Sequence, residues 1–141
     1  LGIPVGLAVD GSASNDGSNL LEELRVAYLL HRLNSSSQAP DGYELLKLAT
    51  RGSAAVLGRS DIGSLEPGKA GDLFLIRKNR LELVGADLDP KSMLGTVGFK
   101  GAVDYTVVNG KIVVRNGKLT GIDEEKAVYE GKRAVNEYLN R

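Results

Sequence analysis

The first candidate for chemistry is Asp10, an acidic residue that directly follows a short apolar run. Residues 5–9 read Val-Gly-Leu-Ala-Val, and the residues just after Asp10 are small or polar. The run is too short for a helix and predicts a buried strand over residues 4–9. A carboxylate at the end of such a strand can bind a metal ion or act as a general base on a metal-bound water. The competing interpretation is that Asp10 only caps its own loop.

Other polar residues compete with Asp10, and each has a simpler structural interpretation. Asp16 is an alternative catalytic acid, but it stands just before a helical pattern, where a carboxylate caps the helix. His31 is the single histidine and lies well along that helix, roughly 20 Å from its start at 1.5 Å per residue. We therefore expect His31 to be a packed residue and not a metal ligand. Ser12 and Ser14 have no nearby histidine base, which argues against a nucleophile.

The elements that would position Asp10 form a βα unit. The strand is followed by a loop over residues 10–17 and by a helix from about Ser18, capped by Ser18 or Asn19. A second helix is predicted over residues 42–57, with Asp41 as its N-cap and Gly58 as its C-cap. The two helices have predicted apolar faces made of Leu20, Leu21, Leu24, Ala27, Tyr28 and His31, and of Leu45, Leu46, Leu48, Ala49, Ala54 and Leu57.

The second half of the chain predicts a small sheet and a terminal helix. The pairs Asn109-Gly110 and Asn116-Gly117 are flanked by β-branched residues and predict two tight hairpin turns. The strands expected around them cover residues 103–108, 111–115 and 118–120, and residues 73–76 form another strand. Asp89-Pro90 starts a short helix through about Leu94, and Asp123 caps a terminal helix through about Leu139. A sheet built from only these three or four strands is expected to need further strands, most simply from a missing N-terminal segment.

Composition excludes several classes of function. The 18 basic and 18 acidic residues give a net charge of zero, which argues against a phosphate-binding surface and a nucleic-acid partner. No apolar run approaches the length of a membrane span. There is no cysteine, which fits a cytoplasmic protein. The chain starts at Leu1 and its single methionine is Met93, so we expect a truncated chain or a proteolytic remnant of a longer one.

Three segments, in order along the chain, resemble the amidohydrolase superfamily. Residues 5–16 with Leu-Leu-Glu-Glu at 20–23 resemble the last barrel strand and its loop. Residues 54–58 and 62–73 resemble the passage from the barrel into a small β-sandwich, and residues 103–117 resemble the closing hairpin of that sandwich. The first segment is most similar to the branch that includes 8-oxoguanine deaminase and hydroxyatrazine ethylaminohydrolase.

The resemblance implies an α/β fold class, namely the C-terminal fragment of a TIM-barrel amidohydrolase. Residues 1–58 would be the last βα segment of the barrel, 59–122 part of the β-sandwich composite domain and 123–141 a C-terminal helix. Asp10 would be the metal-ligating aspartate of the eighth strand, which also transfers a proton during hydrolysis. Ser12, Ser14 and Asn15 would shape the loop beside it. One zinc or iron ion would activate a water for deamination of an aminated purine, pyrimidine or triazine.

The same resemblance places the other metal ligands outside these 141 residues. We therefore expect the isolated fragment to bind metal weakly and to be inactive. The full-length enzyme is expected to be a homo-oligomer. Two alternatives remain open. The chain could be a non-catalytic module for folding or oligomer contacts, or part of a ring-opening enzyme similar to dihydroorotase or imidazolonepropionase. Replacing Asp10 by Asn separates the catalytic hypothesis from the non-catalytic one.

Overall fold

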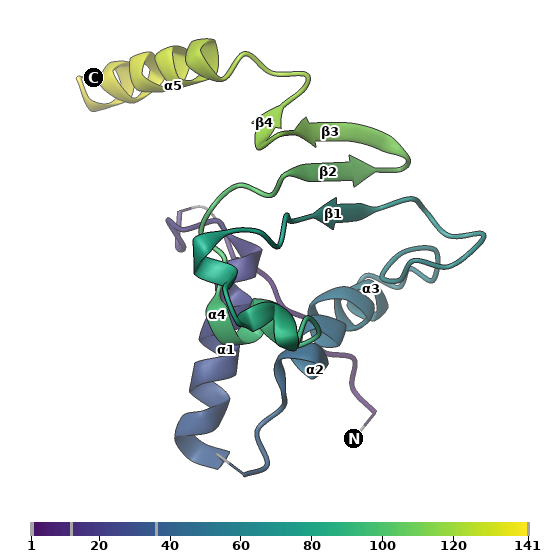
Figure 1. Cartoon of the computed structure of the whole chain (residues 1–141). Coiled ribbons are helices and arrows are strands. Elements are labelled where there is room, and N and C mark those ends of the chain that lie inside the picture. Colours follow the sequence, from purple (N-terminus) through teal and green to yellow (C-terminus); the bar gives the residue numbers. More distant parts are fainter. Residues whose placement is uncertain (1, 12, 36, 141) are drawn as a thin grey trace.

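The computed structural model describes residues 2–11, 13–35 and 37–140. A group of helices forms one part of the molecule, an antiparallel sheet lies beside it, and the C-terminal helix extends beyond the sheet (Figure 1). Helices and strands are thus mixed, as the α/β fold class predicted. Of the helices in the described part, none combines the length and the apolar character that a membrane crossing requires.

The first helix, α1 (Leu20–Ser35), is capped by Asn19. The Asn19 side-chain oxygen accepts a hydrogen bond from the Leu21 N–H at 3.1 Å, which satisfies one of the free amides at the helix start. Its amide nitrogen donates to the Phe99 carbonyl at 3.3 Å. One of the two predicted caps, Asn19, is therefore confirmed. Asp16 does not cap the helix, because α1 begins four residues after it.

The predicted apolar face of α1 is partly wrong. Leu24 is 1% exposed, as expected, but Leu20 and His31 are exposed. Near His31, the Arg32 guanidinium lies 3.4 Å from the centre of the Tyr28 ring and donates to the Pro40 carbonyl. Arg32, and not His31, therefore makes the contacts with Tyr28 and Pro40 at this end of the helix. A second row of apolar side chains is also exposed, namely Val26, Leu29, Leu30 and Leu33.

The predicted second helix is a continuous helical stretch that contains an unpredicted π-helical turn. It consists of α2 (Gly42–Lys47), the π-helical turn (Leu48–Gly52) and α3 (Ser53–Val56). Asp41 forms the expected cap, in which its side chain accepts from the Glu44 N–H and the Glu44 side chain accepts from the Asp41 N–H. Gly58, at φ +66°, ends the stretch. Leu57 is exposed and not inward as predicted.

The end of this stretch is a Schellman motif. The Arg59 N–H donates to the Ala54 carbonyl and the Gly58 N–H donates to the Ala55 carbonyl, each at 3.0 Å. This pair of bonds satisfies two helix-end carbonyls and requires the left-handed conformation that Gly58 adopts. The predicted C-cap is confirmed.

The predicted strand at residues 4–9 does not form. Residues 2–11 have no strand assignment, and Val5 is 54% exposed. A strand requires neighbours that pair with its backbone groups, and none of the other described residues pairs with this segment as a strand. Its backbone instead contacts Ser53, as described below.

The sheet is a four-stranded antiparallel meander. Its strands β1 (Leu73–Leu75), β2 (Tyr105–Val108), β3 (Lys111–Arg115) and β4 (Lys118–Leu119) lie in the order β1-β2-β3-β4. Both Asn-Gly turns occur as predicted, and all four of their residues have positive φ. This conformation matches the twist of antiparallel strands and favours Asn and Gly.

The core of the helical part lies where α1 and α2 meet α4 (Met93–Val97). Leu24, Leu45 and Leu94 are buried there against one another. A Cβ on Gly95 would lie 2.9 Å from the Gly42 Cα, so the backbones of α4 and α2 approach too closely for larger residues. The short helix predicted from Asp89 starts four residues later than expected, and two 3-10 turns, Leu81–Leu83 and Ala86–Leu88, precede it.

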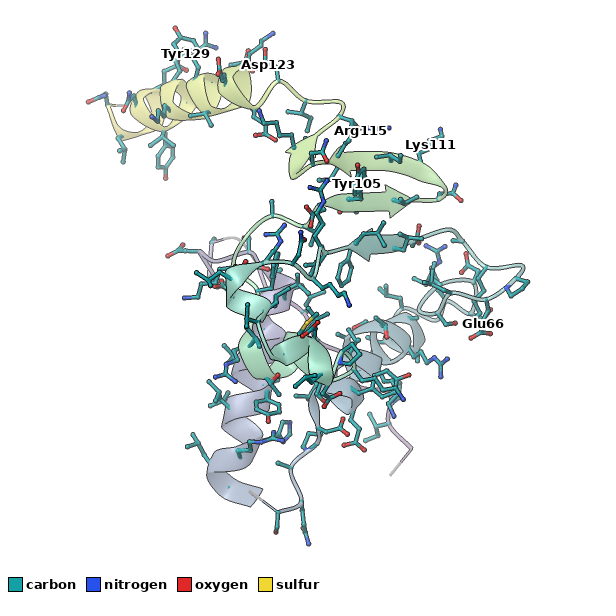
Figure 2. All side chains as sticks on the ribbon, in the orientation of Figure 1. Glu66, Tyr105, Lys111, Arg115, Asp123 and Tyr129 are labelled. Atoms are coloured by element: carbon teal, nitrogen blue, oxygen red, sulfur yellow. The ribbon has the colours of Figure 1, made fainter. Side chains whose placement is uncertain are left out.

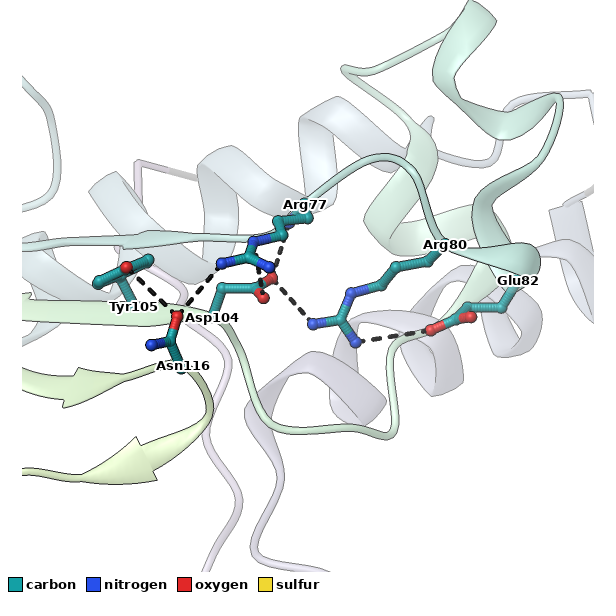
Figure 3. Close-up of polar contacts among 6 residues, drawn as sticks. All are labelled: Arg77, Arg80, Glu82, Asp104, Tyr105 and Asn116. Carbon is teal, nitrogen blue, oxygen red and sulfur yellow. Dashed lines mark hydrogen bonds and ion pairs between the residues drawn. The ribbon is translucent and has the colours of Figure 1, made fainter.

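Asp104 joins the sheet to the helical part (Figure 3). It is 8% exposed and accepts hydrogen bonds from the Arg77 N–H and the Arg80 guanidinium, both at 2.8 Å. Arg80 in turn lies 5.0 Å from the centre of the ring of the buried Phe99. These bonds lower the pKa of Asp104, the Arg77 N–H having the larger effect and the Arg80 guanidinium the smaller one. The junction therefore contains a charged carboxylate.

The terminal helix α5 (Glu124–Leu139) begins where it was predicted. Asp123 caps it by accepting from the Lys126 N–H at 3.0 Å. All its residues are exposed, and Figure 2 shows Asp123 at the start of the helix and Tyr129 along it, away from the rest of the molecule.

Candidate active-site segment

Asp10 lies at the end of the N-terminal segment in an unusual backbone conformation. Its φ is +62°, a region that residues other than glycine rarely enter and that Asp tolerates better than most. Such conformations concentrate at functional sites. The side chain is exposed and is therefore accessible to a ligand.

The carboxylate of Asp10 is held in its charged form. The Ser14 hydroxyl donates to one of its oxygens at 2.8 Å. Hydrogen bonds to a carboxylate favour its ionised form. The Ser14 hydroxyl, and to a smaller extent the Gly11 N–H, therefore lower the pKa of Asp10 below its ordinary value. At neutral pH the residue is thus an anionic oxygen ligand or a proton acceptor.

The loop after Asp10 is closed by its own hydrogen bonds and tied to α1. The N–H groups of Ser14 and Asn15 both donate to the Gly11 carbonyl at 2.9 Å. The Asn15 side chain donates to Glu23 at 2.8 Å and accepts from the Gly17 N–H at 3.0 Å. Ser14 and Asn15 therefore shape this loop, and Ser12 lies outside the described residues.

The segment before Asp10 is anchored at Leu7. The Ser53 hydroxyl oxygen lies 3.2 Å from both the backbone nitrogen and the carbonyl oxygen of Leu7. Ser53 was not singled out in the sequence. The available signal was the Gly52-Ser53 pair inside an otherwise regular helical pattern, a combination that often marks a helix irregularity.

The described residues offer one candidate metal ligand and not a complete site. No group of three or more His, Cys, Asp or Glu side chains gathers anywhere in residues 2–11, 13–35 and 37–140. His31 lies eleven positions after Leu20 in α1, about 16 Å along the helix axis. The exposed, charged carboxylate of Asp10 is suited to serve as one ligand of a zinc ion, because zinc binds carboxylate oxygens together with histidine nitrogens. The remaining ligands would have to come from residues other than these.

A groove of about 730 Å³ lies between the helical part and the sheet. Its lining is mostly apolar and includes Leu46, Ala54, Phe74 and Val107, but not Asp10. The groove therefore does not contain Asp10, although Ser53 lines it.

Comparison with known proteins identifies relatives of this chain. Residues 1–113 match the sequence profile of the Amidohydrolase family. Over 126 residues the chain is 50% identical to hydroxydechloroatrazine ethylaminohydrolase of Pseudomonas sp. (strain ADP), a match that covers 87% of this chain and 26% of that protein. It is 45% identical over 122 residues to 8-oxoguanine deaminase of Pseudomonas aeruginosa, covering 86% of this chain and 27% of that protein.

A solved structure supports the same relationship. The atrazine chlorohydrolase TrzN from Arthrobacter aurescens TC1, complexed with zinc, superposes with a TM-score of 0.86 and 41% identity, covering 94% of this chain and 30% of that one. The chain thus spans about a quarter to a third of the length of these relatives. The resemblance expected from the sequence is confirmed, and the chain belongs to the amidohydrolase family.

Proposed function

We propose that this chain is part of a metal-dependent amidohydrolase that cleaves a C–N bond on an aminated purine, pyrimidine or triazine ring. The observation that carries the proposal is Asp10, an accessible and charged carboxylate, in a chain 50% identical to an ethylaminohydrolase and 45% identical to an 8-oxoguanine deaminase. The names of both relatives describe removal of an amine or amino group from a heterocycle.

We further propose that residues 1–58 complete a barrel, that 59–122 belong to a β-sandwich and that 123–141 form a peripheral helix. Exposed apolar side chains support this arrangement. Val5 in the first segment, Leu33 on α1 and Leu75 in the edge strand β1 are all more than half exposed, and burial of such side chains is the main source of folding free energy. Further chain packed on these surfaces would supply that burial.

In the proposed reaction Asp10 has two tasks. Its carboxylate would hold the metal, commonly zinc in this family, together with ligands from elsewhere in the enzyme. Such an ion supplies Lewis acidity and a water of lowered pKa. The Asp10 carboxylate accepts the proton of the attacking water and later donates it to the departing amine. The Asp10 carboxylate is unprotonated at neutral pH, as a metal ligand and a proton acceptor must be. With one ligand only, the isolated 141-residue chain would not turn over substrate.

The test is the substitution Asp10→Asn in the longer protein, with ammonia or amine release measured on a panel of purines, pyrimidines and triazines. Loss of a general base costs about 10²–10⁴-fold in turnover, so we expect at least a hundredfold loss together with reduced zinc content. Asp16→Asn, which changes the other exposed carboxylate of this loop, should alter turnover by no more than a few-fold. Near-normal turnover of Asp10→Asn would refute the proposal.

A further inference from the structure

The Ser53 hydroxyl contacts both backbone polar groups of Leu7. A single hydroxyl can accept one hydrogen bond while it donates another. Here the Ser53 hydroxyl accepts from the Leu7 N–H and is within donating distance of the Leu7 carbonyl, at 3.2 Å in both cases. Ser53 therefore fixes the backbone at Leu7, within the segment leading to Asp10.

Two glycines make this contact possible. A Cβ on Gly6 would lie 2.6 Å from the Ser53 hydroxyl oxygen and 2.7 Å from the Ser53 Cα, and carbon atoms at these distances clash. A Cβ on Gly52 would clash with the Val5 carbonyl oxygen. Residues 5–7 therefore lie directly against the backbone of Gly52 and Ser53, with no room for a methyl group on either side.

The π-helical turn sets the direction of Ser53. The turn covers Leu48–Gly52 and ends immediately before Ser53. A π turn contains one more residue than an α turn, and each residue rotates the helix by about 100°. Without the extra residue, position 53 would point to a different face. The turn thus directs Gly52 and Ser53 toward the N-terminal segment, and π-helical turns are frequent at functional sites.

We propose that Ser53, directed by this π-helical turn, is a positioning residue for Asp10. The inference rests on the proposed role of Asp10. Leu7 is three residues before Asp10, a span of at most about 10 Å, and the Asp10 carboxylate has to reach a metal site built from other elements. Ser53 contacts the backbone of Leu7 and does not reach the carboxylate. A displacement of about 1 Å at a reacting group can cost about 10²-fold in rate.

The first test is Ser53→Ala in the longer protein. We expect kcat to fall about tenfold with KM unchanged, zinc to be lost faster to a chelator, and the Leu7 amide to exchange faster with deuterium. Thr96→Ala is the matched control, because the Thr96 hydroxyl also bonds to a carbonyl of its own helical stretch, that of Ser92, but lies outside the π-helical turn. It should change each of these quantities by less than twofold.

The second test approaches the contact from its other side. Gly6→Ala adds a methyl group against Ser53, and we expect the same three changes, at least as large as those of Ser53→Ala. Gly121→Ala is its control, because a Cβ at Gly121 would meet no atom within 4 Å. This pair keeps the inference testable if Ser53→Ala impairs folding.

The outcomes separate the two proposals. If Asp10→Asn is inactive while Ser53→Ala and Gly6→Ala keep normal kcat and zinc retention, the positioning role is wrong and the proposed function stands. If Asp10→Asn retains near-normal turnover, both proposals fall. Parallel losses of kcat and zinc in Ser53→Ala and Gly6→Ala, but not in their controls, support the positioning role.

Discussion

The burial of Leu24 predicts a large and specific stability cost for Leu24→Ala. Leu24 is 1% exposed and packs with Leu45 and Leu94 where α1, α2 and α4 meet. The substitution removes three carbon atoms, which costs about 2.4 kcal/mol at about 0.8 kcal/mol per buried methylene. A residual void of about 40 Å³ would add about 1 kcal/mol. We therefore expect the free energy of unfolding to fall by about 3 kcal/mol.

The assay is urea unfolding of the 141-residue chain at 25 °C and at several protein concentrations. Leu33→Ala is the matched control, because Leu33 lies on the same helix but is 78% exposed. It should cost less than about 0.5 kcal/mol, as is usual for exposed positions. A cost below about 1 kcal/mol for Leu24→Ala, or equal costs for the two variants, would refute this description of the core.

Two further predictions concern the junction and a helix end. The Arg77 N–H and the Arg80 guanidinium lower the pKa of Asp104 in the folded state. The charged carboxylate therefore stabilises the fold above the unfolded pKa of about 3.9. This stabilisation is lost as the pH falls through the folded pKa. In Asp104→Asn the free energy of unfolding, measured with urea between about pH 5 and 2, should therefore fall less steeply with decreasing pH than in the unsubstituted chain. An equally steep fall would contradict this. Gly58→Ala should lower the free energy of unfolding, measured by thermal unfolding, by about 1 kcal/mol, because Gly58 has a φ of +66° and open space around it. An unchanged free energy of unfolding would contradict the Schellman motif at this helix end.

Local features of the fold were predictable because short-range chemistry determines them. The turns at Asn109-Gly110 and Asn116-Gly117 need positive φ, which these residue types supply. The caps Asp41 and Asp123 bond to amides three residues later, so each cap and its partner lie within one turn of sequence. Such features do not depend on distant parts of the chain.

Features that depend on distant partners were predicted less well. The strand at residues 4–9 needs neighbouring strands that the described residues do not provide. His31 is exposed, and it is Arg32 that contacts the Pro40 carbonyl beyond the end of the helix. Ser53 could not be identified as a contact of Leu7, because 46 residues separate them and the π-helical turn changes the direction of its side chain. Asp10 could be proposed as a candidate site residue from its position after an apolar run, whereas the contacts that hold its segment could not be predicted.

The most direct test of the role of Asp10 is a crystal structure of the longer protein with diffraction measured at the zinc absorption edge. The anomalous signal locates the ion independently of any assumed ligand. We predict an Asp10 carboxylate oxygen at about 2.0–2.2 Å from the zinc. A zinc ion with a complete set of other ligands and no Asp10 oxygen within about 4 Å would contradict the proposed function.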